Sequence, residues 1–233
     1  MDKSSSEPNE SPKDLSIGIL GTELYETPEG ESGQALVINS TRGEIPCLFH
    51  EAENEQLGIV WVGGARGGFT GPAGGIYKKF SDSLTSKGIS SLRLHYRQPN
   101  NLEECVLDTL AGVGLLEFLG IKQIILIGHS FGGAVVISAA PLSESTVGVV
   151  AMSSQTYGAS RAGDISPRKL LLIHGLNDTR LGPHCSEFIF EWANEPKKII
   201  LLEGGGHGLS EVIEDVEEAL EIWLNEFITK YIN

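Results

Sequence analysis

Three residues of this chain, Ser130, Asp178 and His207, could together carry out nucleophilic acyl transfer. A serine hydroxyl becomes a good nucleophile when a histidine takes its proton, and the histidine needs an acid to orient its ring. Each of the three follows closely after a short apolar run that is typical of a buried strand. Because the carboxyl ends of parallel strands meet at one edge of a sheet, the three side chains are predicted to converge there.

Ser130 lies in the pattern G-x-S-x-G, between two apolar segments. The run Ile124–Ile127 predicts a buried strand, and Ala134–Ala140 predicts a helix that Pro141 ends. The chain has 29 glycines, so such a pentapeptide would arise by composition alone about 0.3 times. The motif is therefore weak by itself, and its alternative interpretation is a glycine-rich turn with a capping serine. Its position between a strand and a helix favours a nucleophile.

The glycines around Ser130 fit a sharp turn from strand to helix. Gly128 and Gly132 are expected to lack side chains because a Cβ atom there would collide with the turn. Gly133 would let the helix lie close to the sheet. A serine on such a turn is expected to have a strained backbone.

Asp178 and His207 are the predicted acid and base, and each has an alternative. Asp178 could instead cap the helix expected near Pro183, and Asp164 is a competing acid. His207 could be a structural loop residue, but the glycines around it suit a side chain that needs freedom to reach. His174 is the second candidate for the base. The remaining histidines are expected to pack or to lie at the surface: His50, His95, His129 and His184.

The order serine, aspartate, histidine and the segments IGHSFGG, LLIHGLNDTR and LEGGGHG resemble the α/β-hydrolase superfamily. The resemblance covers roughly Ile45–Ile232. It implies an α/β fold with a mostly parallel central sheet of about eight strands and helices on both faces. In that fold the second strand runs antiparallel to the others.

The glycine-rich segment Gly63–Pro72 follows the predicted strand Leu57–Val62. It lacks the lysine of a Walker loop and the dinucleotide fingerprint, so it is not predicted to bind phosphate. Its backbone N–H groups could instead point into a cleft. The expected oxyanion hole consists of the Phe131 N–H and one N–H of this segment, which the resemblance assigns to Gly64 or Ala65. Arg66 could attract a substrate carboxylate or could simply be solvated.

Few residues separate the strand predicted to end near Ser153 from the strand predicted to begin near Leu170, which leaves little or no room for a cap domain. The site is therefore expected to be open and shallow and to take small acyl esters or thioesters. Dienelactone hydrolases share this capless plan but have cysteine at the position of Ser130. The side chains expected to line the site are Phe69, Phe131, Gln155 and Tyr157.

Strands and helices are predicted to alternate along most of the chain, which indicates a mainly parallel sheet. No element is predicted in Leu15–Leu24, where Gly18 and Gly21 interrupt the pattern. Pro183–Asn194 is expected to be a helix with Trp192 facing inward, and the last helix is expected to span Leu209–Tyr231. The other predicted strands are Ala35–Ile38, Ile45–His50, Ile89–Tyr96, Val147–Met152, Leu170–His174 and Ile199–Leu202, and the other predicted helices run from Ile76 and from Asn101.

Composition narrows the class of protein. The net charge of −14 disfavours nucleic acid and anionic membrane as partners. Three widely spaced cysteines with no C-x-x-C pair disfavour a zinc site or a redox pair, and a reducing, cytoplasmic location fits them best. Residues 1–14 are predicted to be a disordered polar tail, followed by one domain over residues 15–233. Neither a signal peptide nor a transmembrane helix is expected.

The sequence therefore predicts a serine hydrolase that cleaves small acyl esters through an acyl-enzyme, without a metal or an organic cofactor. A thioesterase or an acyltransferase on the same three residues is the alternative within enzymes. A ligand-binding or interaction protein with little turnover is the alternative outside them, since fold does not fix function. The oligomeric state is not predicted.

Overall fold

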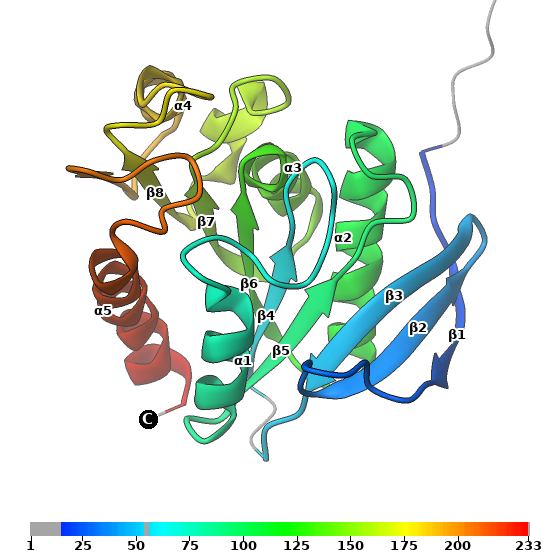
Figure 1. The fold of residues 1–233 in the computed structure, drawn as a ribbon. Helices are drawn as coiled ribbons and strands as arrows, with labels where there is room; N and C mark the ends of the chain where they lie inside the picture. The colour runs from blue at the N-terminus through cyan, green and yellow to red at the C-terminus, as the bar shows by residue number, and fades with distance from the viewer. Residues whose placement is uncertain (1–14, 54–55, 233) are drawn as a thin grey trace, which may run out of the picture.

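The computed structural model describes residues 15–53 and 56–232, and it is built around a nine-stranded sheet with helices on both faces (Figure 1). The predicted polar tail, residues 1–14, lies outside the described residues. The strand order is β1-β2-β3-β5-β4-β6-β7-β8-β9. The strands are β1 (Ile19–Leu24), β2 (Gln34–Ser40), β3 (Gly43–His50), β4 (Leu57–Val62), β5 (Ile89–Leu94), β6 (Gln123–His129), β7 (Thr146–Met152), β8 (Lys169–Gly175) and β9 (Lys197–Leu202).

Strands β4 to β9 run parallel to one another, and β3 pairs antiparallel with β5. The eight strands β2 to β9 match the predicted sheet, and β3, the second of them, has the predicted antiparallel direction. The ninth strand, β1, was not predicted. It pairs antiparallel with β2 although all 6 of its residues are exposed. Its main support is backbone pairing with β2, and because every residue is exposed it carries no pattern of burial that the sequence could reveal.

The helices are α1 (Ile76–Thr85), α2 (Leu102–Phe118), α3 (Phe131–Ala139), α4 (His184–Trp192) and α5 (Ile213–Tyr231). Alternate side chains of each central strand point to opposite faces of the sheet and so form two cores. In β6, Ile124 and Leu126 join the core under α2, α3 and α4, whereas Ile125 and Ile127 join the core under α1 and α5. The apolar run at this position is therefore buried on both sides.

Two helix predictions need correction. Trp192 does not face inward: it is 43% exposed and stacks on Phe188, because only one side of α4 meets the sheet. The last helix begins at Ile213 rather than Leu209, since Leu209 has a φ of 55°, which a helix does not allow. In contrast, Asn101 caps α2 as predicted and accepts a hydrogen bond from the Glu104 N–H.

No cap domain covers the carboxyl edge of the sheet after β7. Between β7 and β8 the chain forms only loops and the short 3₁₀ helix η2 (Ser160–Ile165), and all of these residues are described. In residues 15–53 and 56–232, no helix has both the length and the apolar composition that crossing a bilayer requires.

Candidate active site

Ser130 occupies the sharp turn between β6 and α3. Its backbone has a φ of 58° and a ψ of −119°, a conformation that residues other than glycine rarely adopt. Two backbone hydrogen bonds hold it: the Ser130 N–H donates to the Met152 carbonyl at 2.8 Å, and the Gly133 N–H donates to the Ser130 carbonyl at 3.0 Å. The predicted strain at the serine is confirmed.

The glycines of the turn are required by close backbone contacts. A Cβ atom on Gly128 would lie 2.1 Å from the Gly132 carbonyl oxygen, and one on Gly132 would lie 2.3 Å from the Gly63 carbonyl oxygen. A Cβ atom on Gly133 would lie 2.7 Å from the Ser154 side chain, so this glycine does let α3 approach the sheet. Backbone atoms cannot move aside as a flexible side chain can, so the first two positions exclude every other residue.

The variant Gly128→Ala is therefore expected to unfold more easily than the wild type, by about 3 kcal/mol in the free energy of unfolding. Urea denaturation followed by circular dichroism measures this. Gly114→Ala is the matched control, since its Cβ would meet only the tip of Ile19, at 3.3 Å, and alanine favours a helix. Equal stabilities of the two variants would contradict this account of the turn.

The structure brings the side chains of Ser130, His207 and Asp178 into one hydrogen-bonded chain. His207 Nε2 lies 3.0 Å from Ser130 Oγ, and His207 Nδ1 lies 2.7 Å from Asp178 Oδ2. The Asp178 side chain is fully buried, while 15% of the His207 side chain is exposed. The His207 ring thus contacts a buried carboxylate on one side and a half-buried hydroxyl on the other.

Asp178 accepts hydrogen bonds at both carboxylate oxygens. Its Oδ1 accepts from the N–H groups of Arg180 and Leu181, at 2.8 and 2.9 Å. Burial alone would raise the pKa of Asp178, but the bonds from His207 and from these two N–H groups lower it below its ordinary value. The carboxylate is therefore ionised at neutral pH. The competing acid, Asp164, pairs with Arg161 at the surface instead.

His174, the second candidate for the base, contacts the acid rather than the serine. Its Nε2 lies 2.8 Å from the Leu181 carbonyl oxygen and 3.2 Å from Asp178 Oδ2, and its Nδ1 lies 2.7 Å from Ser186 Oγ. Because a carbonyl oxygen only accepts, Nε2 carries the proton and Nδ1 accepts from the serine. Burial lowers the pKa of His174, which keeps the ring neutral. His174 thus braces the buried carboxylate.

His129 was expected only to pack or to lie at the surface, but it holds the histidine loop. Its Nε2 donates to the His207 carbonyl oxygen at 2.8 Å, and the two rings lie 5.0 Å apart. Burial lowers the pKa of His129 to about 4, so the ring stays neutral near pH 7. The only signal in the sequence was its position beside Ser130 in the motif.

The loops that carry Asp178 and His207 pack directly on each other. A Cβ atom on Gly175 would lie 2.2 Å from the Gly205 carbonyl oxygen. That oxygen also accepts the Asn177 N–H at 2.9 Å. The glycines before His207 were expected to give its side chain freedom to reach. The structure shows a packing role for Gly205: a Cβ atom there would lie 2.8 Å from the Val212 side chain and 3.1 Å from Gly175 Cα, so its missing side chain allows close contact between the two loops.

The loop after β4 lies beside Ser130. A Cβ atom on Gly64 would be 3.6 Å from the Ser130 Cβ, so this backbone is next to the serine. The Gly67 N–H donates to the Gly64 carbonyl at 2.8 Å, and the Gly68 N–H donates to His95 Nδ1 at 2.7 Å. Ala65 and Arg66, at the tip of this turn, are exposed.

The four side chains expected to line the site differ in how far they are buried. The Phe131 ring does not line the site, because it is 3% exposed and packs edge-on against Tyr96 in the core. Phe69 is half-buried against His95, with ring centroids 5.9 Å apart. Gln155 donates from its side chain to the Tyr157 carbonyl at 2.9 Å, and the Tyr157 side chain is 73% exposed.

The titratable groups of the site do not form a metal centre. Within the described part of the chain, no group of three or more His, Cys, Asp or Glu side chains is arranged to hold a metal ion. The arrangement that the structure does show is a serine hydroxyl, a histidine and a carboxylate in series, next to a glycine-rich backbone turn. Such a set is suited to proton transfer from the hydroxyl and to attack on a carbonyl carbon.

Comparison with solved structures finds the same fold in several hydrolases at low sequence identity. Est1E from Butyrivibrio proteoclasticus has a TM-score of 0.70 and 18% identity, over 85% of this chain and 100% of that one. XC6422 from Xanthomonas campestris, described as a serine hydrolase without a lid, has a TM-score of 0.68 and 17% identity, over 87% and 98%. A dienelactone hydrolase from Anabaena variabilis has a TM-score of 0.70 and 14% identity, over 88% and 98%. No model of a protein family matches the sequence, and no curated protein sequence matches it significantly.

Proposed function

We propose that this chain, which has the α/β-hydrolase fold, is a serine hydrolase that cleaves small acyl esters. One observation carries the proposal: His207 is hydrogen-bonded at both ring nitrogens, to Ser130 Oγ on one side and to the ionised Asp178 on the other. A base held in this way is oriented to take the hydroxyl proton. The fold alone would not support an activity, since it hosts many functions.

In the proposed reaction, Ser130 Oγ attacks the acyl carbon while His207 Nε2 takes its proton. Asp178 holds the proton on Nδ1 and stabilises the imidazolium that forms. The negative charge that develops on the carbonyl oxygen is accepted by the Phe131 N–H and by an N–H of the loop after β4, at Gly64 or Ala65. The Phe131 N–H lies at the first residue of α3, where the helix dipole also favours negative charge.

Collapse of this intermediate breaks the bond to the leaving group, which receives the proton from His207. The acyl group then remains on Ser130 as an ester. A water molecule, deprotonated by His207, attacks that ester and releases the acid, and the proton returns to Ser130 Oγ. No metal or organic cofactor takes part in these steps.

The proposed substrates are small because the edge of the sheet after β7 has no cap domain to enclose a long acyl chain. The exposed Arg66 would attract a carboxylate on the substrate, and Phe69, Gln155 and Tyr157 would line its approach. Ferulic acid has been found bound to Est1E, a similar structure at 16% identity, so esters of aromatic acids belong among the candidates. p-Nitrophenyl acetate, p-nitrophenyl butyrate, methyl ferulate and an acyl thioester form a suitable panel.

Intact-mass spectrometry after treatment with a fluorophosphonate tests the proposal. The folded protein is expected to gain one adduct, which peptide mapping places on Ser130, and urea-unfolded protein is expected to gain none. The difference between the two states shows that the fold activates the serine, rather than the reagent labelling any hydroxyl. A folded protein that gains no adduct would overturn the hydrolase proposal and favour a ligand-binding role.

A further inference from the structure

The two peptide carbonyls at the carboxyl end of β4 are each held by a buried tyrosine. Tyr77 Oη donates to the Val62 carbonyl at 2.9 Å, and Tyr96 Oη donates to the Gly63 carbonyl at 3.0 Å. Both tyrosines are 1% exposed or less. Burial raises the pKa of each hydroxyl above its ordinary value, so both keep their protons and remain donors throughout the working pH range.

The bond to Gly63 has a consequence for the neighbouring residue. The carbonyl of Gly63 and the N–H of Gly64 belong to one planar peptide and point in opposite directions. A hydroxyl that fixes the carbonyl therefore also fixes the direction of the Gly64 N–H. The next peptide, which carries the Ala65 N–H, is fixed in turn by the bond from the Gly67 N–H to the Gly64 carbonyl. Of the two N–H groups proposed for this side of the oxyanion hole, Tyr96 therefore orients that of Gly64, while the turn itself orients that of Ala65.

The ring of Tyr96 reaches the other side of the same hole. It packs edge-on against Phe131, with the ring centroids 6.2 Å apart and an angle of 89° between the rings. Phe131 supplies the second proposed donor through its backbone N–H. One buried side chain therefore contacts both segments that must point their N–H groups at the same oxygen atom.

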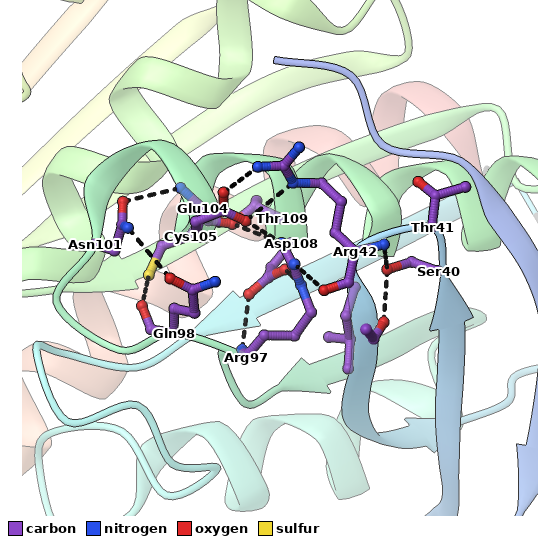
Figure 2. A network of polar contacts seen from close by, with 12 residues as sticks. Ser40, Thr41, Arg42, Arg97, Gln98, Asn101, Glu104, Cys105, Asp108 and Thr109 are labelled. Carbon is purple, nitrogen blue, oxygen red and sulfur yellow. Dashed lines mark hydrogen bonds and ion pairs between the residues drawn. The ribbon is translucent and has the colours of Figure 1, made fainter. Parts of the chain in front are cut away.

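Backbone hydrogen bonds from the residues before and after Tyr96 hold its segment of chain in place. The His95 N–H donates to the Pro46 carbonyl at 2.9 Å, and the Arg97 N–H donates to Asp108 Oδ2 at 2.8 Å. The Arg97 side chain pairs with Asp108 and with Glu104 on α2, in a polar network between α2 and the turn after β2 (Figure 2). The backbone around Tyr96 is thus anchored to α2 and β3.

We propose that Tyr96 is a positioning residue that fixes both halves of the oxyanion hole, through its hydroxyl on Gly63 and its ring against Phe131. The proposal rests on the proposed hydrolase function. It assigns no proton transfer to Tyr96 and no contact with the substrate. Its effect is confined to the transition state, because the oxyanion forms only there.

Tyr77 provides a matched control within the same strand end. Its hydroxyl also bonds a backbone carbonyl, that of Val62, and it is equally buried. Val62, however, pairs with Leu94 of β5 on one side and with Gly128 of β6 on the other, so the sheet fixes its position without the tyrosine. Removing this hydroxyl leaves a carbonyl short of one partner but does not free the Gly63–Gly64 peptide.

The experiment compares Tyr96→Phe with Tyr77→Phe in the full chain. For Tyr96→Phe, kcat on p-nitrophenyl butyrate and the second-order rate of fluorophosphonate labelling are each expected to fall about 10- to 100-fold. KM is expected to change by less than about twofold, since the ground-state ester makes no use of the hole. For Tyr77→Phe, all three quantities are expected to stay within about threefold of wild type. Urea midpoints of both variants show whether they lose similar stability.

The results separate the proposal for Tyr96 from the hydrolase proposal on which it rests. A fall in kcat that is specific to Tyr96→Phe, at equal urea midpoints, supports the proposal. Equal rates for the two variants, or a rise in KM at unchanged kcat in Tyr96→Phe, would overturn it while leaving the hydrolase function intact. A wild-type protein that neither reacts with the fluorophosphonate nor hydrolyses any ester would overturn both.

Discussion

Replacing Ser130 by alanine is expected to lower kcat by about 10⁶-fold and to abolish the fluorophosphonate adduct. The reason is that Ser130 Oγ is the atom proposed to form the covalent bond, and the hydroxyl at 3.0 Å from His207 Nε2 has no substitute at this turn. Some acceleration over water is expected to remain, because the proposed oxyanion donors are backbone groups that the variant keeps. Ester hydrolysis and intact mass measure the two effects.

The variant should fold as the wild type does. Ser130 already has a φ of 58°, and alanine at this φ bears a similar backbone strain, so urea midpoints should nearly coincide. Ser138→Ala, on the same helix-turn segment, is a control that should keep both turnover and adduct. An adduct that persists in Ser130→Ala would show that another residue is the nucleophile and would refute the assignment.

The variant Asp178→Asn is expected to lower kcat by about 10⁴-fold. Asp178 accepts from His207 and His174 at Oδ2 and from two backbone N–H groups at Oδ1. An asparagine has one acceptor oxygen, so its NH₂ group must replace one of the two carboxylate oxygens. It then faces either the two backbone N–H groups or the two histidine rings. If it faces His207, the ring adopts the wrong tautomer and its Nε2 can no longer take the serine proton.

The matched control is Asp164→Asn, which changes the competing acid identified from the sequence. Asp164 is exposed and pairs with Arg161 in the surface 3₁₀ helix η2, so its replacement should leave kcat unchanged. Comparable loss of activity in the two asparagine variants would contradict the assignment of Asp178. Labelling of Asp178→Asn by the fluorophosphonate should slow in parallel with kcat, because both reactions need the base.

The central strands and the order of the candidate site residues could be predicted because local features encode them. The apolar run before Ser130 is buried on both faces of the sheet, so it appears as consecutive β-branched and leucine residues. Gly128 records a contact with the backbone of Gly132, only four residues further along the chain. Patterns of this kind survive in the sequence without knowledge of the rest of the chain.

Other features depend on contacts between distant segments and left no such pattern. Strand β1 is held by backbone pairing with β2, and the inward face of α4 is set by where the sheet lies. The positions of His129, His174 and Tyr96 become meaningful only when His207, Asp178 and Gly63 are seen beside them. A histidine in an apolar strand end or a tyrosine after a strand is equally compatible with simple packing.

The contact between Gly175 and Gly205 means that the entropy lost in ordering the His207 side chain is lost during folding and not during substrate binding. Because the two loops interlock and His129 also holds the His207 carbonyl, the imidazole is ordered when the chain folds. The ring then need not be immobilised again each time a substrate arrives, so little of the substrate's binding energy is diverted to organising the base. We also expect tolerance to substitution to differ between these loops. The exposed residues at the tip of the loop after β4 are open to change for specificity, whereas the interlocked glycines are not.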